Sequence, residues 1–175
     1  MDEGTSDFSI KVERVHIMSN YKENAEYIKS FLDEVKWHYD MHNYDGMRRV
    51  LFTGGIGGSN EPYGSFHYMA IVDDNAAECY ATLPASAQAR LPQMSEFITR
   101  ANYNLKYGAF EMDYNDGQIR FRLAFPMVAL RADRALIMLL FCLPVNVLAQ
   151  HFKGITEVLT DLKTPEEAIA DCERQ

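Results

Sequence analysis

The sequence predicts an α+β fold in which an antiparallel sheet of about five strands packs against helices. Three observations indicate this class. Apolar residues recur at helical spacing in several segments, other segments alternate apolar and polar residues, and polar Asp, Asn and Gly clusters separate the alternating segments. The expected order is helix, three strands, helix, two strands, helices. No linker-like tract divides the 175 residues, so we expect one domain over residues 20–175, preceded by an N-terminal extended segment at residues 1–19.

The N-terminal segment has a strand-like pattern at residues 8–17. Apolar residues occupy every second position and continue after a slip of one residue. This alternation predicts an extended segment, and the slip predicts a β-bulge. The apolar positions are Phe8, Ile10, Val12, Val15 and Ile17.

The first helix is expected to begin at Asn20, because Asn20 and Glu23 have the spacing of a capping box. A single apolar stripe at three- and four-residue spacing follows, and it predicts a helix that continues to a turn at residues 43–46. The stripe consists of Ala25, Ile28, Leu32, Val35 and Tyr39.

Five strands and one intervening helix are expected in the middle of the chain. A polar cluster at residues 73–75 predicts the turn between the second and third strands. Asp116-Gly117 predicts the hairpin between the fourth and fifth strands. In the fifth strand Arg120 and Arg122 alternate with apolar residues, so one face is expected to be buried and the other wet. The expected strands are 47–53, 65–72, 77–83, 110–114 and 118–124, and the helix carries Met94, Phe97, Ile98 and Ala101 on one face.

The last third of the chain is expected to be helical. One helix is predicted over residues 131–143, and Pro144 suits the first turn of another. A short final helix is expected to have Thr164 at its N-cap, Pro165 at N1 and Glu167 at N3.

Composition and charge exclude several classes of protein. The chain has 17 basic and 25 acidic residues, a formal net charge of −8, which argues against a nucleic-acid binder. The most apolar stretch, residues 135–149, is shorter than the ~20 residues of a membrane-spanning helix, so we expect a core or interface helix instead. The N-terminus lacks the pattern of a secretory signal, and Cys79, Cys142 and Cys172 are widely spaced. A cytoplasmic protein without a disulfide framework or thiolate zinc site is therefore expected.

No motif in the sequence predicts catalysis, a cofactor or a metal. The glycine-rich residues 54–58 lack the lysine of a phosphate-binding loop and are interpreted as a hairpin loop. His38 and His42 have the i, i+4 spacing of metal ligands on a helix, but without the glutamate of the zincin motif. Nucleophile–base pairs are also missing, so an enzyme is not predicted. A small-ligand or metal-binding domain, with its site near Trp37, His38 and His42 or near residues 54–58, is the alternative function.

The run at residues 136–148 is apolar on all sides of a helix. Such a helix is either buried centrally or shared with a second subunit, and both readings stay open. A homodimer that docks a partner segment on its sheet or helix surface is the first functional hypothesis. The expected dimer or partner interface consists of Leu136, Leu139, Leu140, Leu143 and Val147.

Three further segments resemble the central pattern of the YbjN-like family. They are residues 97–104 (FITRANYN), 108–111 (GAFE) and 116–122 (DGQIRFR), and residues 164–169 resemble the family's closing helix. The resemblance covers about residues 20–172, over the same span as the helix and strand periodicity. Members are described as bacterial sensory transduction regulators. The resemblance implies a fold like that of type III secretion chaperones and a cytoplasmic, often dimeric protein that handles protein partners and offers no catalytic residues to transfer.

Overall fold

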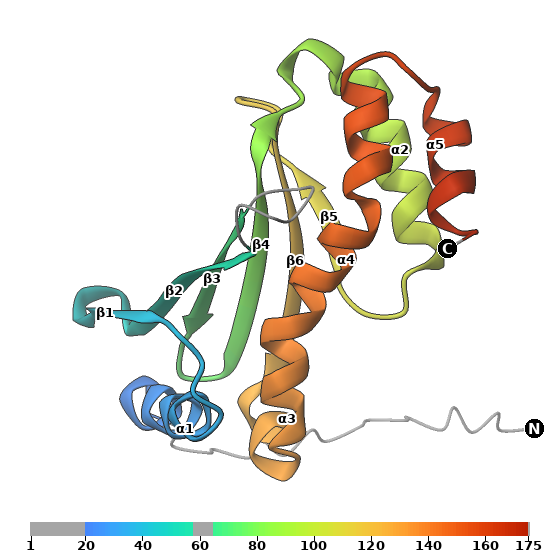
Figure 1. The fold of residues 1–175 in the computed structure, drawn as a ribbon. Coiled ribbons are helices and arrows are strands. Elements are labelled where there is room, and N and C mark those ends of the chain that lie inside the picture. Colours follow the sequence, from blue (N-terminus) through green and yellow to red (C-terminus); the bar gives the residue numbers. More distant parts are fainter. Residues whose placement is uncertain (1–19, 58–64, 175) are drawn as a thin grey trace, which may run out of the picture.

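The structure is a computed structural model that describes residues 20–57 and 65–174. Its centre is a six-stranded, fully antiparallel sheet with strand order β1-β2-β3-β4-β6-β5 (Figure 1). The strands are β1 (Asp40–Tyr44), β2 (Arg49–Gly57), β3 (Ser65–Val72), β4 (Ala76–Ser86), β5 (Ala109–Met112) and β6 (Gln118–Pro126). The helices are α1 (Tyr21–Glu34), α2 (Leu91–Asn104), α3 (Met127–Ala132), α4 (Ala135–Leu159) and α5 (Pro165–Cys172).

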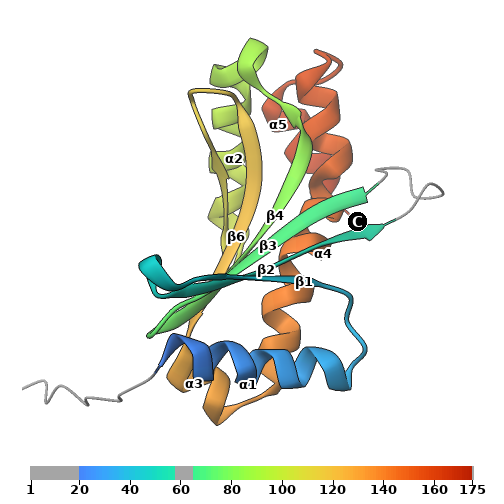
Figure 2. The same cartoon turned by 90° about the vertical axis from the view of Figure 1, so that its left-hand side faces the viewer.

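The helices lie to one side of the sheet or below it, and no helix within residues 20–57 or 65–174 covers the opposite face, which we call the open face (Figure 2). The helix α4 runs along the covered face, with α2 and α5 beside its C-terminal half and α3 at its other end (Figure 1). The core between sheet and helices is rich in fully buried phenylalanines: Phe52, Phe66, Phe97, Phe121 and Phe141. The predicted α+β class is therefore confirmed: the sheet forms one layer and the helices form the other.

The sheet has six strands and not about five, because the first helix is shorter than predicted. The helix α1 ends at Glu34, and Lys36 adopts a left-handed φ of 56° that turns the chain away. Residues 40–44 then form β1 against β2. Tyr39 still reaches the core, with its ring 5.4 Å from that of Phe52, but from the approach to a strand. The helical spacing of Tyr39 from Leu32 and Val35 therefore predicted a helix where the chain is not helical.

The predicted break at Pro144 is also wrong. The helix α4 is continuous over 25 residues and contains Pro144, which is buried in its interior. A proline inside a helix costs about 3 kcal/mol, so the packing of this helix offsets a substantial local penalty. The helix that was expected to begin at Arg131 begins at Ala135 instead, and Arg131 belongs to the separate helix α3. Asp133 separates the two helices, and its carboxylate accepts a hydrogen bond from the Ala135 amide at 2.9 Å.

Several local predictions are confirmed. The Asn20 side chain caps α1 by accepting from the Lys22 amide, as an N-cap without the expected capping box to Glu23. At α5, Thr164 and Glu167 form a complete capping box. In the turn before β6, Gly117 has a φ of 72°, which a side chain rarely adopts. The predicted extended segment at residues 8–17 lies outside the residues that the structure describes.

Candidate functional site

The two halves of α4 have different surroundings. The C-terminal half is enclosed by the sheet, α2 and α5, and the N-terminal half has neither α2 nor α5 beside it (Figure 1). Apart from His151, no ionisable residue other than cysteine occurs between Ala135 and Phe152. An exposed helix face that carries no charged side chain is typical of an interaction surface.

The predicted interface residues divide between the core and the surface. Leu140 is 0% exposed and Val147 is 7% exposed, so both belong to the core of the protomer. Leu136 and Leu143 are half-buried and pack against that core. Leu139 is also half-buried, but it is not among the residues that pack against the core. It lies on the same side of the helix as Met138, Cys142 and Asn146.

We call Met138, Leu139, Cys142 and Asn146 the outer stripe of α4. Three of these side chains are half-buried and Asn146 is exposed. Burial raises the pKa of the Cys142 thiol above its usual value, so this cysteine is a weak nucleophile that contributes apolar surface. The sequence indicated that this segment is helical but could not distinguish its core side from its outer side, because both are apolar.

The helix α4 is also the one helix among residues 20–57 and 65–174 that is long and apolar enough to cross a membrane. The sequence predicted that the apolar stretch of 15 residues is too short to span a membrane, but the helix that contains it has 25 residues, so its length no longer excludes a membrane span. The indication is weak, because central helices of soluble domains pass the same test. Here Ile137, Leu140 and Phe141 are fully buried against the rest of the fold.

The open face of the sheet carries a cluster of charged residues around Tyr80. The guanidinium carbon of Arg120 lies 4.3 Å from the centre of the Tyr80 ring, and that of Arg122 lies 5.9 Å from it. Arg120 pairs with Glu111 at 2.7 Å, and Arg122 pairs with Glu78 at 2.7 Å. The predicted wet face of β6 is thus confirmed, and its arginines are neutralised by carboxylates on neighbouring strands.

Beside this cluster the open face has a shallow hollow of about 440 Å³ above the glycines of β2. Gly54 is required by packing, because a Cβ there would lie 2.5 Å from the Tyr68 ring. Gly55 is not, since a Cβ there would meet only ordinary contact with the Phe66 carbonyl oxygen at 3.7 Å. A glycine inside a strand often marks a bulge, a tight bend or a place where a ligand or another backbone approaches closely. The hollow is lined by Asp40, Thr53, Gly54, Gly55, His67, Tyr68, Met69 and Thr82.

The two histidines at i, i+4 do not form a metal site. His38 precedes β1 and His42 lies within it, so the helix that would have put them side by side ends earlier, at Glu34. Four residues of extended chain span ~13 Å, too far for one ion. Within the part of the chain that the structure describes, no group of three or more His, Cys, Asp or Glu side chains could hold a metal. The expected loop at residues 54–58 is likewise corrected, because β2 continues to Gly57.

The Trp37 side chain joins the end of α1 to the sheet and to α4. Its indole Nε1 donates a hydrogen bond to the Tyr68 hydroxyl at 3.0 Å, and that hydroxyl donates to the His38 carbonyl oxygen at 2.7 Å. Burial raises the pKa of Tyr68 to about 12. The Trp37 and Tyr68 rings both lie edge-on to Phe141 of α4, at 5.9 and 5.7 Å. The residue is therefore part of the packing and does not face a binding site.

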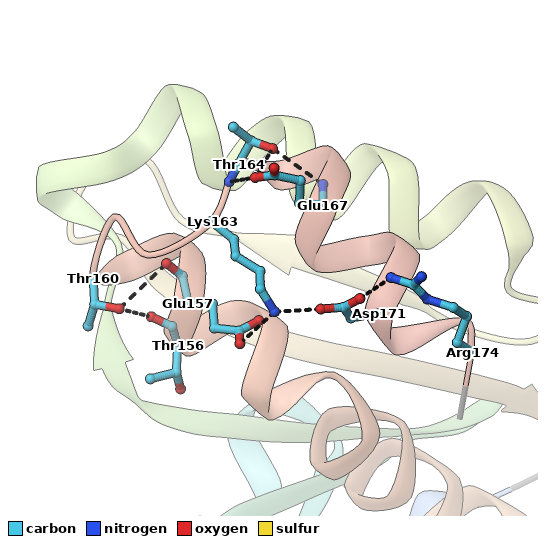
Figure 3. Close-up of polar contacts among 8 residues, drawn as sticks. All are labelled: Thr156, Glu157, Thr160, Lys163, Thr164, Glu167, Asp171 and Arg174. Atoms are coloured by element: carbon cyan, nitrogen blue, oxygen red, sulfur yellow. Dashed lines mark hydrogen bonds and ion pairs between the residues drawn. The ribbon is translucent and has the colours of Figure 1, made fainter.

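The junction of α4 and α5 contains a polar network that holds the C-terminal half of α4 in place (Figure 3). Lys163 lies between the Glu157 carboxylate at 2.8 Å and the Asp171 carboxylate at 2.5 Å. Asp171 also pairs with Arg174. The hydrogen bonds that the Lys163 ammonium donates to Asp171 and Glu157 raise the pKa of Lys163, so the ammonium stays charged. The network balances two carboxylates with two cations and links α4 to α5, although the Oε2 atom of Glu157 is buried without a hydrogen-bond partner.

Searches against models of known protein families, curated proteins and solved structures found no match. The residues and their geometry are therefore the basis for a functional conclusion.

Proposed function

We propose that this chain is a non-enzymatic protein-interaction module that acts as a homodimer through the outer stripe of α4. The observation that carries this proposal is a partly exposed helix side with no charged residue, formed by the half-buried Met138, Leu139 and Cys142 and the exposed Asn146. In a two-fold dimer, the outer stripe of one copy packs against the outer stripe of the other. The two surfaces match because both are apolar and have a polar amide near one end. Leu136 and Leu143 extend the stripe at its margin.

The resemblance to the YbjN-like family supports a regulatory or chaperone-like role in the cytoplasm. The six-stranded sheet with one open face agrees with a module that docks a segment of a protein partner. Paired arginines and carboxylates around Tyr80 give this face polar groups for orientation. The net charge of −8 weighs against nucleic acid as the partner.

The test of the dimer is the mass of the protein in solution. We expect light scattering at micromolar concentration to give twice the chain mass for the unmodified protein and the chain mass for Leu139→Asp, because a buried carboxylate has no partner in an apolar interface. Val128→Asp is the matched control, since Val128 is exposed on α3, outside the stripe, and should leave the dimer intact. A monomer for the unmodified protein, or a dimer for Leu139→Asp with native circular dichroism, would contradict the proposal.

The alternative function, a small-ligand-binding domain, is favoured by the hollow above Gly55. Asp40, Thr53, His67 and Thr82 surround it with polar side chains, and Met69 adds an apolar wall. Thermal-shift measurements with nucleotides and divalent ions test this alternative. A shift that Gly55→Val abolishes would support it, and the absence of any shift would remove it.

A further inference from the structure

The helices α2 and α5 pack side by side and leave a groove of about 450 Å³ between them (Figure 1). Ile169 of α5 is 7% exposed and forms an apolar floor. Thr99 of α2 and Ala170 of α5 also line the groove, and both are exposed. Because these two side chains are small, another element of structure can approach both helices closely.

A single exposed tyrosine stands at the α2 wall of the groove. Tyr103 is 88% exposed, the largest exposed fraction among the large apolar side chains of residues 20–57 and 65–174. Its ring therefore contributes little to the packing of the protomer. Tyrosine is a frequent anchor of protein interfaces, since it combines a large rigid ring with a polar hydroxyl.

Carboxylates outnumber cations around the groove. Glu166 and Glu173 line it from α5, and Arg100 lines it from α2. The Arg100 guanidinium lies 2.9 Å from the carboxylate of Glu96 on its own helix and 3.8 Å from that of Glu166. Glu173 accepts a hydrogen bond from the Asn104 amide at 2.5 Å, which brings no charge. Three carboxylates thus share one guanidinium, and the groove suits a partner with basic side chains.

Both walls of the groove are held in place by the rest of the fold. A capping box fixes the start of α5, and Lys163 links Asp171 of α5 to Glu157 of α4. On α2, Met94 and Phe97 are fully buried in the core. A partner that enters a preformed groove loses little binding free energy to the ordering of this chain.

We propose that the groove between α2 and α5 binds a basic amphipathic helix of a partner protein. The side-chain ridge of a third helix fits between two packed helices. Helices satisfy their backbone groups internally, so this surface offers no strand edge to an extended segment. Apolar side chains of the partner contact Ile169 and Tyr103, and its lysines or arginines pair with Glu166 and Glu173. The inference goes beyond the α4 dimer, because it uses none of the outer stripe.

The test is the binding of a fluorescently labelled model peptide to the full chain, measured by anisotropy. The peptide has about 14 residues, the length at which an isolated helix begins to be stable, with leucines on one face and lysines on the other. We expect saturable binding with a dissociation constant below about 100 µM. A peptide with glutamate in place of each lysine, and a lysine peptide with proline at its centre, should both bind at least about tenfold more weakly.

Two pairs of variants locate the binding site. Glu166→Lys is expected to weaken binding at least about fivefold, whereas Glu26→Lys on α1 changes the net charge equally and should alter the affinity by less than about twofold. Tyr103→Ala is also expected to weaken binding at least about fivefold, and Tyr44→Ala in β1 should not. All four side chains are exposed, so the variants should fold normally.

Equal losses of affinity in Glu166→Lys and Glu26→Lys would overturn the inference, because the peptide would then respond only to net charge. Undiminished binding of the proline peptide, or no saturable binding of the lysine peptide, would overturn it as well. The titration is repeated in Leu139→Asp, where we expect unchanged affinity. A loss of affinity there would place the peptide on the outer stripe and overturn the inference, so failure of the groove is distinguished from failure of the α4 dimer.

Discussion

The two halves of α4 differ both in composition and in surroundings. The N-terminal half is almost entirely apolar, whereas the C-terminal half also contains Gln150, His151, Lys153, Thr156 and Glu157. In the C-terminal half, Gly154 lies so close to α5 and α2 that an added Cβ would be 2.8 Å from the Cys172 sulfur and 3.0 Å from the Phe97 ring. In the N-terminal half, Leu139 is half-buried on a side of the helix that nothing in the described protomer fully covers. The comparison teaches that apolar composition alone does not indicate burial, and that contact between helices has to be established residue by residue.

The largest expected effect separates two adjacent leucines of the N-terminal half. Leu140 is fully buried, so Leu140→Ala is expected to lower the free energy of unfolding by about 3 kcal/mol through lost burial and a new cavity. Leu139→Ala is expected to lower it by less than about 1 kcal/mol when measured in the monomeric state. Urea unfolding followed by circular dichroism measures both. Equal losses for the two variants would mean that the two sides of the helix are equally covered.

The second prediction tests the close packing of the C-terminal half. Gly154→Val is expected to lower the free energy of unfolding by about 2 kcal/mol, because the added methyl groups force α5 and Phe97 away from α4. Gly46→Val is the control, since a Cβ at Gly46 would have no neighbour within 4 Å. The same urea titration applies. A neutral Gly154→Val would show that α5 adjusts freely, and the C-terminal half would then be no more tightly packed than the outer stripe.

The smallest expected effect concerns His151, which lies in the C-terminal half between the rings of Phe97 and Phe110. Burial lowers its pKa below the usual value of 6.5. The unfolded chain therefore binds the proton more readily than the folded one, and stability falls as the pH decreases below about 6.5. We expect His151→Gln to reduce this loss of stability between about pH 7.5 and 5.5. An unaltered pH dependence in His151→Gln would mean that the site is accessible to water.

The sequence predicted those features that depend on neighbouring residues. The capping box of Thr164 and Glu167, the turn at Gly117 and the alternating faces of β6 all follow from local spacing, and the structure confirms each of them. The strand β1 was missed because Tyr39 stands at helical distance from Leu32 and Val35, and because Lys36 is not a residue type that signals a left-handed turn. The continuity of α4 through Pro144 was missed because it depends on tertiary packing.

The candidate interface was only partly predictable for the same reason. The apolar run of α4 was evident, but the side that faces the core is decided by elements distant in the sequence, such as β4 and β6. Leu140 and Leu139 are neighbours in the chain and chemically identical, so no local pattern distinguishes them. Gly55 could have been singled out as a strand glycine only after β2 was known to extend through it.

The single tryptophan of the chain gives this molecule a built-in spectroscopic reporter. Trp37 is hydrogen-bonded to Tyr68 of β3 and lies edge-on to Phe141 of α4, immediately after α1. Its fluorescence therefore depends on three elements at once: the first helix, the sheet and the central helix. A red shift of its emission would report the separation of sheet and helix layers, and the signal needs no label.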